Sequence, residues 1–221
     1  FFTRKQELNG KKILITAGPT YEKIDPVRFI GNYSSGKMGY ALAEACAERG
    51  AEVTLVSGPV NLKVTHPNIH RMDVESAEQM YNAAVSAYTE ADAGILCAAV
   101  ADFTPETVAG QKIKREKDDL VLRLKPTHDI AAALGKQKQA HQKLVGFALE
   151  TTDEVAHAQD KLNRKNFDFI VLNSLNDKGA GFRCDTNKIT IIDRQGTTPY
   201  PLKGKKEVAD DIIDRLVDLF S

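Results

Sequence analysis

The stretch KMGYALAEACAERGAEVTLVSGP, residues 37–59, decides the fold of this chain. Its first part has helical spacing, with Met38, Leu42 and Cys46 on one side, and Gly50 is the residue type that commonly follows the end of a helix. Its second part, AEVTLVSGP, is apolar and rich in valine, which predicts a buried strand. A helix that leads directly into a buried strand is typical of α/β sheets.

The same alternation extends in both directions from this stretch. The run KKILIT at residues 11–16 predicts a strand before the helix, and AGPT ends that strand. Further helices are expected near residues 75–89, from Thr127 or Asp129 through Leu134, at 153–166 and at 206–220. Further strands are expected at 93–103, where the strand runs into a loop, at 120–124, 144–151 and 167–173, and as a late antiparallel pair at 188–193 and 198–202. Strands that alternate with helices imply a mostly parallel sheet with both faces covered.

Composition narrows the classes of partner. Thirty basic residues balance thirty acidic ones, so we expect no basic surface for nucleic acid or for an anionic membrane. The longest apolar runs are too short to span a bilayer, and the N-terminal FFTRKQELNG turns polar at once, unlike a secretion signal. We therefore expect one domain over residues 1–221, with a linker-like segment at 1–10 and a small-molecule partner.

The cysteines predict a reducing compartment. Cys46, Cys97 and Cys184 are widely spaced and odd in number, which suggests neither a disulfide framework nor a zinc site. A cytoplasmic location fits this usage best. No base is identifiable beside Cys184, so we do not interpret it as a nucleophile.

The segment GNYSSGKMG at residues 31–39 has the spacing of a phosphate-binding P-loop, but Met38 replaces the hydroxyl residue that reaches magnesium. A long irregular stretch also separates Gly31 from the first strand, whereas a P-loop glycine follows its strand immediately. A dinucleotide site is not indicated either, because G-x-G-x-x-G is missing and the second strand ends in Val56-Ser57-Gly58 without an acidic residue. Two interpretations remain. Ser34, Ser35 and Gly36 leave backbone N–H groups free to bind an anion, helped by the helix dipole and Lys37, or the serines merely cap the helix.

A second segment has the profile of a mobile lid. The run TPETVAGQKIKREKDD at residues 104–119 is long, polar and poor in apolar residues. It contains Lys112 and Lys114, which from composition alone would be a solvated charge run.

Several motifs in one order resemble a known family. Residues 15–59 are ITAGPTYEKIDPVRFIGNYSSGKMGYALAEACAERGAEVTLVSGP, followed by CAAVADF at 97–103, QKIKRE at 111–116, THDIAAAL at 127–134, GFALET at 146–151 and KLNRKNFDFIVLN at 161–173. The chain resembles phosphopantothenoylcysteine synthetase over nearly its whole length. That resemblance implies a Rossmann-like three-layer α/β fold with a mostly parallel sheet and a late antiparallel extension, and a homodimer.

The resemblance also implies an enzymatic activity. The family joins 4′-phosphopantothenate to L-cysteine with CTP and magnesium, through an acyl-cytidylate intermediate, in coenzyme A biosynthesis. In bacteria it is usually the C-terminal half of a bifunctional protein, so a decarboxylase domain is an expected neighbour. The sequence leaves open how strictly CTP excludes ATP. The magnesium ligands are also open, since phosphates can supply most of them and Asp102 is the candidate side chain.

The resemblance also implies site residues. Asn32 corresponds to the family's active-site asparagine and Lys112 to the lysine required to convert the intermediate. Arg28 corresponds to a substrate phosphate or subunit contact, although Asp25 could equally hold it in an ion pair. The nucleotide-binding residues implied are Ser34, Ser35, Gly36, Leu96, Cys97, Ala98, Asp102, Lys112, His128, Asp129, Ile130, Ala131, Phe147, Lys161 and Lys165.

Several of these positions have competing interpretations. Phe147 could be a core residue. Lys161 and Lys165 share one helix face, which from spacing alone would be a solvent face. This chain has Thr127-His128 where many relatives have a proline before the aspartate, so the backbone path there is open.

Two other functions remain as alternatives. A nicotinamide-dependent short-chain-type oxidoreductase would need a Tyr-x-x-x-Lys motif that is absent. A non-catalytic nucleotide-sensing module would bind the same ligands without releasing pyrophosphate.

Overall fold

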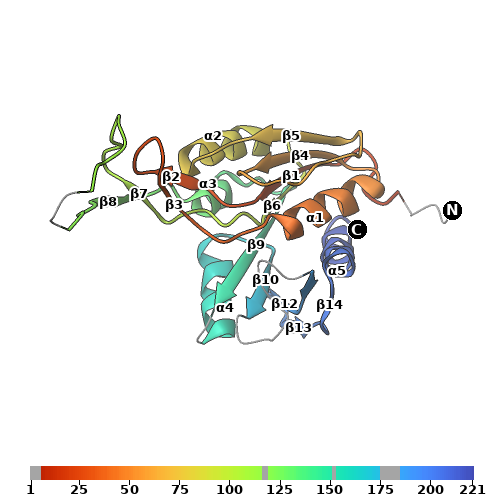
Figure 1. Cartoon of the computed structure of the whole chain (residues 1–221). Coiled ribbons are helices and arrows are strands. Elements are labelled where there is room, and N and C mark those ends of the chain that lie inside the picture. Colours follow the sequence, from red (N-terminus) through yellow and green to blue (C-terminus); the bar gives the residue numbers. More distant parts are fainter. Residues whose placement is uncertain (1–5, 116–118, 151–152, 175–184) are drawn as a thin grey trace.

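Eight strands form one sheet in the order β13-β12-β10-β9-β6-β1-β4-β5 (Figure 1). The computed structural model describes residues 6–115, 119–150, 153–174 and 185–221. The parallel strands are β1 (Lys12–Ala17), β4 (Glu52–Ser57), β5 (Ile69–Asp73), β6 (Ala93–Leu96), β9 (Lys143–Glu150) and β10 (Phe169–Ser174). At the other edge, β12 (Ile189–Asp193) and β13 (Thr197–Pro199) run antiparallel.

Helices cover both faces of this sheet. One face packs against α1 (Lys37–Glu48) and α5 (Lys205–Asp218), which also lie against each other. The opposite face carries α2 (Ala77–Tyr88), α3 (Ile130–Gln137) and α4 (Glu154–Arg164). Buried side chains of β1 alternate between the two cores, Ile13 and Ile15 toward the first and Leu14 toward the second, as a strand covered on both faces requires. The predicted three layers and late antiparallel extension are confirmed.

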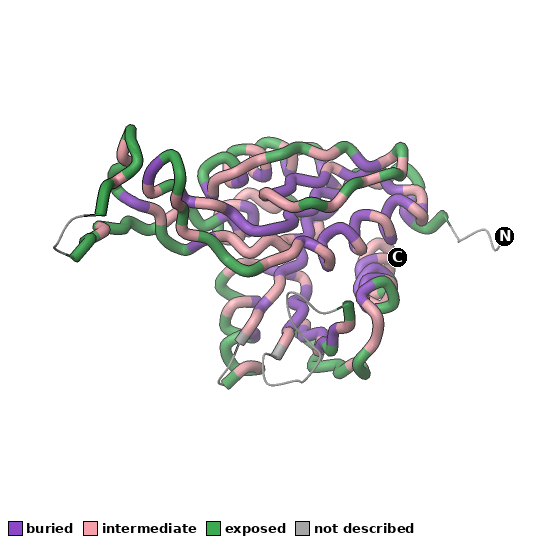
Figure 2. The backbone as a smooth tube through the Cα atoms, in the orientation of Figure 1, coloured by how far each residue is buried: buried purple, intermediate pink, exposed green. Residues whose placement is uncertain are grey.

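Two short antiparallel pairs extend from the carboxyl side of the sheet. They are β2 (Tyr21–Lys23) with β3 (Phe29–Gly31), and β7 (Phe103–Pro105) with β8 (Leu124–Pro126). We call the described residues within 21–33 and 103–126 the arm. The arm projects to one side in Figure 1 and is mostly exposed in Figure 2. A third pair, β11 (Thr186–Asn187) with β14 (Lys203–Gly204), lies next to α5.

The local signals of the sequence account for most element ends. Helix α1 ends as predicted, with Gly50 at φ 93° just after the C-cap Arg49. Of the two candidate caps for α3, Asp129 is the N-cap, since its Oδ1 accepts from the Ala132 N–H at 2.8 Å. The hydroxyl of Thr127 instead donates to the Ala101 carbonyl at 2.7 Å.

One expectation about a strand was wrong, and the edge strand β5 was missed. Only Leu124 of the run 120–124 lies in a strand, because this run belongs to the arm, where Leu120 and Val121 stay exposed and no sheet face buries them. The strand β5 was not predicted at all. It is an edge strand in which Ile69 is the one buried residue, so it has no apolar run to mark it.

Within the described ranges, none of the helices has the length and apolar character needed to cross a lipid bilayer. Cys184 lies outside the described residues. That it does not act as a nucleophile therefore stays a prediction.

Candidate functional site

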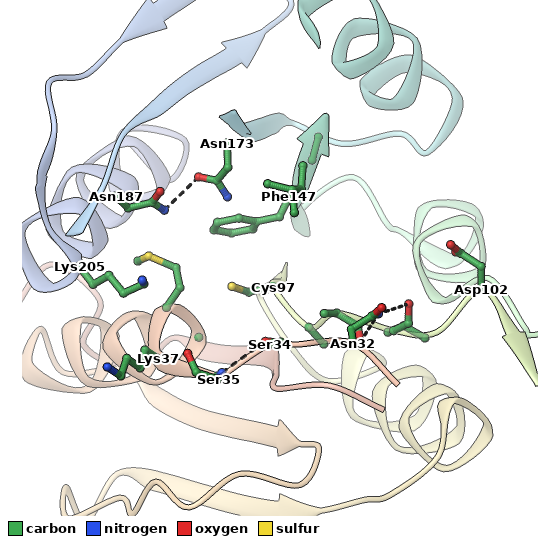
Figure 3. A pocket seen from close by; sticks show the side chains of 18 of the residues that line it. Asn32, Ser34, Ser35, Lys37, Cys97, Asp102, Phe147, Asn173, Asn187 and Lys205 are labelled. Carbon is green, nitrogen blue, oxygen red and sulfur yellow. Dashed lines mark hydrogen bonds between the residues drawn. The ribbon is translucent and has the colours of Figure 1, made fainter. Parts of the chain in front are cut away.

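Two neighbouring cavities open where the parallel strands end. The larger one has a volume of about 450 Å³ and lies between the start of α1, the ends of β6, β9 and β10, and the start of α5 (Figure 3). The smaller one has a volume of about 290 Å³ and lies between β6, β9, the start of α3 and the C-terminal end of α4. They share the lining residues Ala98, Val100, Asp102, Phe147 and Lys161, so they form one continuous site. A site at the carboxyl ends of parallel strands is the expected position in α/β folds.

The smaller cavity brings together most of the predicted nucleotide-binding residues. They come from four separate segments of the sequence and all line its wall: Leu96, Ala98, Asp102, His128, Asp129, Ile130, Ala131, Phe147, Lys161 and Lys165. Cys97 lines the larger cavity instead.

Lys165 and Asp129 close one side of the smaller cavity. The Lys165 ammonium donates to Asp129 Oδ2, while Oδ1 of the same carboxylate caps α3. Partial burial acts to raise the pKa of Asp129, but the hydrogen bonds from Lys165 and from the Ala132 N–H outweigh it, and the pKa lies below its ordinary value. Asp129 is therefore ionised at neutral pH, and Lys165, whose side chain is only 12% exposed, does not lie on a solvent face.

Lys161 joins the two cavities. Its ammonium donates to the Phe147 carbonyl at 2.9 Å, and both residues line both cavities. Phe147 is partly buried, packs against the core and faces the site (Figure 3). Phe147 is thus both a core residue and a residue of the cavity wall, and Lys161 lies on that wall as well.

The backbone around Thr127 and His128, left open by the sequence, follows a fixed path. The Thr127 N–H donates to the Asp102 carbonyl at 3.0 Å. The His128 ring lies 2.6 Å from a Glu78 carboxylate oxygen through Nδ1 and 5.0 Å from the Tyr81 ring centroid. These contacts hold the start of α3 against α2 and against the loop after β6.

The start of α1 forms the floor of the larger cavity. Gly36 is the N-cap, with φ 76°, and as a glycine it has no side chain to cap the first turn. Ser34 Oγ accepts from the Gly36 N–H at 3.3 Å, so this serine holds the turn before the helix. Ser34, Ser35 and Gly36 all line the larger cavity beside the first N–H groups of α1, and their contact with an anion stays a prediction. Met38 is buried in the core and also lines the cavity, so it is no replaced metal ligand.

Asn32 lies at the junction between the α1 loop and β6. Its Nδ2 donates to the carbonyls of Ala99 at 3.1 Å and Val100 at 3.3 Å (Figure 3). These bonds fix the amide orientation, so Asn32 has its Oδ1 left as an acceptor for a donor group in the cavity.

Asp102 and Cys97 both line the larger cavity. Asp102 is exposed, lines both cavities and is the sole carboxylate among the described lining residues of the larger one. Burial raises the pKa of Cys97 to about 12, against the opposing charge of Lys205, so its thiol stays protonated at neutral pH. No cluster of three or more His, Cys, Asp or Glu side chains exists in the part of the chain that the structure describes.

Lys112 and Arg28 lie on the arm. Lys112 is exposed and lines neither cavity. Arg28 donates to Asp25 through Nε at 3.0 Å and through Nη2, and also donates to the Ile113 carbonyl at 2.6 Å. The structure thus realises the ion-pair alternative for Arg28, and its contact with substrate stays a prediction.

The sequence did not single out three residues of the larger cavity. Asn173 lies at the end of β10, Asn187 in β11, and Lys205 is the first residue of α5. A signal existed for Asn173, because strand ends in such sheets are where ligands bind. Asn187 and Lys205 reach the site only through the packing of the last third of the chain onto α1, which no local pattern encodes.

Comparisons with known proteins agree with this geometry. A model of the family described as DNA/pantothenate metabolism flavoprotein C-terminal domain matches residues 8–219. The "Cysteine/Cysteine sulfinic acid decarboxylase" of an unknown prokaryotic organism is 56% identical, over 99% of this chain and 62% of the relative. The coenzyme A biosynthesis bifunctional protein CoaBC of Haemophilus influenzae is 44% identical, over 100% of this chain and 54% of the relative. The chain thus spans little more than half the length of these curated relatives.

A solved structure shows the same fold at high similarity. The crystal structure of the C-terminal domain of coenzyme A biosynthesis bifunctional protein CoaBC has a TM-score of 0.83 and 43% identity, with 97% of this chain and 98% of that chain covered. By the extent of these matches, the chain belongs to the family of DNA/pantothenate metabolism flavoprotein C-terminal domains.

Proposed function

We propose that this chain is a phosphopantothenate–cysteine ligase domain of coenzyme A biosynthesis, formed by residues 1–221, that uses CTP. The observation that carries the proposal is the junction of the two cavities at Ala98, Val100, Asp102, Phe147 and Lys161. A reaction that transfers a nucleotidyl group to a second substrate needs two adjoining subsites that meet at one phosphorus atom. The name of the CoaBC relatives supports the assignment to coenzyme A biosynthesis.

The reaction has two steps. A carboxylate oxygen of 4′-phosphopantothenate attacks the α-phosphorus of CTP, the bond to the β-phosphate oxygen breaks, and pyrophosphate leaves with the bonding electrons. The amine of L-cysteine then attacks the acyl carbon, CMP leaves, and an amide forms as the amine loses a proton. Both steps place negative charge on oxygen atoms, so positioned donors and cations supply most of the catalysis.

The described residues divide between these tasks. The cytidine would occupy the smaller cavity beside Phe147. The ammonium groups of Lys161 and Lys165 would bind the phosphates of the nucleotide. The acyl group would lie in the larger cavity beside Asn32, whose Oδ1 can accept from the attacking amine. Lys112 would close from the arm over the intermediate, as a mobile lysine can.

The residues present fit one magnesium ion held chiefly by phosphates. Mg²⁺ keeps several waters and usually takes one or two carboxylates together with substrate phosphates. Asp102 is exposed at the junction of the cavities and would supply that carboxylate. The ion would neutralise phosphate charge.

The oxidoreductase alternative has less support. In a dinucleotide-binding fold the pyrophosphate lies against the loop after the first strand. Here the Val60 side chain packs there, since a Cβ added to Gly18 or Gly36 would lie 3.1 Å or 3.0 Å from Val60 Cγ1. The sensor alternative would use the same cavities and requires an activity measurement.

Assembly and location are part of the proposal. The relatives are longer than this chain, and the word "bifunctional" in the CoaBC name supports a second, decarboxylase activity fused to this domain. We propose a homodimer formed through the arm. Among the residues that the structure describes, eight of the eleven exposed large apolar side chains lie on the arm, and such patches mark interaction surfaces. We also propose a cytoplasmic location.

The test is an assay of the purified protein with phosphopantothenate, cysteine and either CTP or ATP. We expect pyrophosphate release that requires both CTP and phosphopantothenate, and amide product that requires cysteine in addition. Nucleotide binding without pyrophosphate release would favour the sensor instead. Product formation with ATP at the rate seen with CTP would contradict the proposed preference for CTP.

A further inference from the structure

The loop after β6 forms a wall that the two cavities share. We call residues 97–102 the β6 loop, and its residues Ala98, Val100 and Asp102 line both cavities. Strand β6 ends just before this loop, so the backbone N–H and C=O groups of the loop no longer belong to the regular ladder of the sheet. The place of the shared wall therefore depends on the other groups that bind this backbone.

The first half of the β6 loop is bound by β1, by the turn after β1 and by Asn32. The Ala99 N–H donates to the Gly18 carbonyl at 2.9 Å. The Asn32 amide donates to the carbonyls of Ala99 and Val100 (Figure 3). Two further N–H groups donate to Thr16 of β1, those of Cys97 and Ala98. The first half of the loop is thus held without any contact to the start of α3.

The second half of the β6 loop is held at Ala101 by two threonine hydroxyls. Thr20 Oγ1 accepts from the Ala101 N–H at 2.9 Å, and Thr127 Oγ1 donates to the Ala101 carbonyl at 2.7 Å. A hydroxyl can take either part because it carries one donor and two acceptor lone pairs. Thr20 and Ala101 are buried, so removing either hydroxyl would leave a backbone group of Ala101 that water reaches poorly.

Thr127 also ties the start of α3 to this half of the loop. The Thr127 N–H donates to the Asp102 carbonyl at 3.0 Å, and Thr127 lines the smaller cavity. The four residues that follow it, 128–131, lead into α3 and line the same cavity. Through Thr127, two segments of the wall of the smaller cavity are therefore held at a fixed separation.

We propose that Thr127 and Thr20 are positioning residues for the nucleotide. Their hydroxyls fix Ala101, and thereby hold Asp102 and the start of α3 at the separation at which the smaller cavity binds CTP. This inference rests on the proposed ligase function, which places CTP in that cavity. Neither hydroxyl takes part in making or breaking a bond of the substrates. A loop that is already held in its bound position adds affinity, because less freedom is lost when the ligand binds.

The test measures binding of CTP to the full chain by titration calorimetry, with and without magnesium. Thr127→Val keeps the shape of the side chain and removes its hydroxyl. The matched control is Thr89→Val, because the Thr89 hydroxyl donates to the Ser86 carbonyl at the same distance of 2.7 Å, at the end of α2 and outside both cavities. We expect Thr127→Val to weaken CTP binding by about tenfold, as for loss of a buried hydrogen bond, and Thr89→Val to change it by less than about twofold.

The second step of the reaction separates positioning from a general defect of the site. Asn32 binds the first half of the loop, so conversion of the acyl-cytidylate at saturating CTP should stay within about threefold of the wild type in Thr127→Val. Quenched single-turnover assays measure this rate. Thr127→Ser restores the hydroxyl and should bind CTP within about threefold of the wild type. Thr20→Val should weaken CTP binding as Thr127→Val does, while thermal unfolding shows a folded protein.

Three results would overturn the positioning role. They are a CTP affinity of Thr127→Val equal to that of the wild type, a Thr127→Ser variant that binds as weakly as Thr127→Val, and a conversion rate that falls in parallel with CTP affinity. If Thr127→Val does not fold, Thr127→Ala gives the same comparison with Thr127→Ser.

These outcomes are distinguishable from failure of the ligase proposal. If the protein bound CTP with this dependence on Thr127 but formed no amide product, the positioning role would stand and the ligase function would fall. If the protein formed product while Thr127→Val bound CTP like the wild type, the positioning role alone would be wrong.

Discussion

The Arg28 guanidinium and the Asp25 carboxylate enclose the backbone of Ile113. Asp25 Oδ2 accepts from the Ile113 N–H at 3.1 Å, and Arg28 Nη2 donates to the Ile113 carbonyl at 2.6 Å. Asp25 also accepts from the N–H groups of Val27 and Arg28. This network ties the β2–β3 loop to the segment that contains Lys112, so two parts of the arm are held as one unit.

The Asp25 network makes stability depend on pH. Burial acts to raise the pKa of Asp25, but its bonds from Arg28, Val27 and Ile113 prevail and hold the pKa far below the ordinary value. A depressed native pKa gives stability that is fully present above the unfolded pKa, about 4, and is lost as pH falls toward the native pKa. We expect Asp25→Asn to be less stable than the wild type at pH 7, with a difference that narrows below about pH 4. Urea unfolding at several pH values measures this, and a constant difference from pH 7 to pH 3 would contradict it.

Asn32→Asp should separate the two steps of the reaction. An aspartate would direct a carboxylate oxygen at the Ala99 and Val100 carbonyls in place of the amide donor. We expect pyrophosphate release to persist and conversion of the acyl-cytidylate to slow by about a hundredfold, the effect typical of losing one positioned group. Quenched single-turnover assays follow both species. Asn61→Asp, outside both cavities, is the control, and normal turnover in Asn32→Asp would exclude the role.

Lys112→Gln should reduce product formation far more than Lys114→Gln. Both lysines are exposed neighbours of Ile113 on the arm, so they form a matched pair. The role of Lys112 requires that it reach the cavity once substrates are bound. We expect a loss of at least about a hundredfold in the rate of amide formation for Lys112→Gln and less than about threefold for Lys114→Gln. Similar losses in the two variants would mean that the segment acts through its charge alone.

The paired change Lys161→Gln and Lys165→Gln should raise the CTP requirement selectively. The two ammonium groups line the smaller cavity and contact the Phe147 carbonyl and Asp129. We expect the KM for CTP to rise at least about tenfold, because charged hydrogen bonds are lost, and the KM for cysteine to stay within about twofold. Lys136→Gln on the exposed side of α3 serves as the control. An equal rise in both KM values would refute nucleotide contact.

Val121→Glu should disrupt the proposed dimer. Val121 is 86% exposed on the arm, so the substitution should leave the fold of the monomer intact. A charge in an apolar interface is strongly disfavoured, and we expect light scattering to show a shift from dimer to monomer. Val155→Glu places the same charge on α4, where Val155 is 43% exposed and off the arm, and should remain dimeric. A wild-type protein that is monomeric, or a dimeric Val121→Glu variant, would contradict the arm as the interface.

Local sequence signals were sufficient for the layers, whereas the candidate site residues came from the family resemblance. The helix of residues 37–48 and strand β4 follow from the spacing of their apolar residues and from Gly50. The family motifs place Asp129, Lys161 and Lys165 together, and helix spacing explains why the two lysines share a face. The helix, the strand and the shared face of the two lysines depend on residues close together in the sequence, whereas Asp129 joins the lysines only in the folded chain.

The features that escaped prediction depend on tertiary surroundings. The edge strand β5 is a strand because β4 offers it hydrogen bonds, while its own residues are mostly polar. The alternating run at 120–124 lacks a sheet partner over most of its length and stays outside a strand. Lys205 resembles any lysine at the start of an amphipathic helix, and only the packing of α5 against α1 brings it to the cavity.

The packing of α5 against α1 has a consequence for protein synthesis. Residues 32–39 leave the ribosome long before residues 205–218, yet both groups line or support one cavity. A nascent chain therefore lacks a complete cavity until α5 has been translated and has docked on α1. The proposed nucleotide ligand could stabilise only chains that have passed this point, so we expect it to protect them from proteolysis and to leave shorter nascent chains exposed.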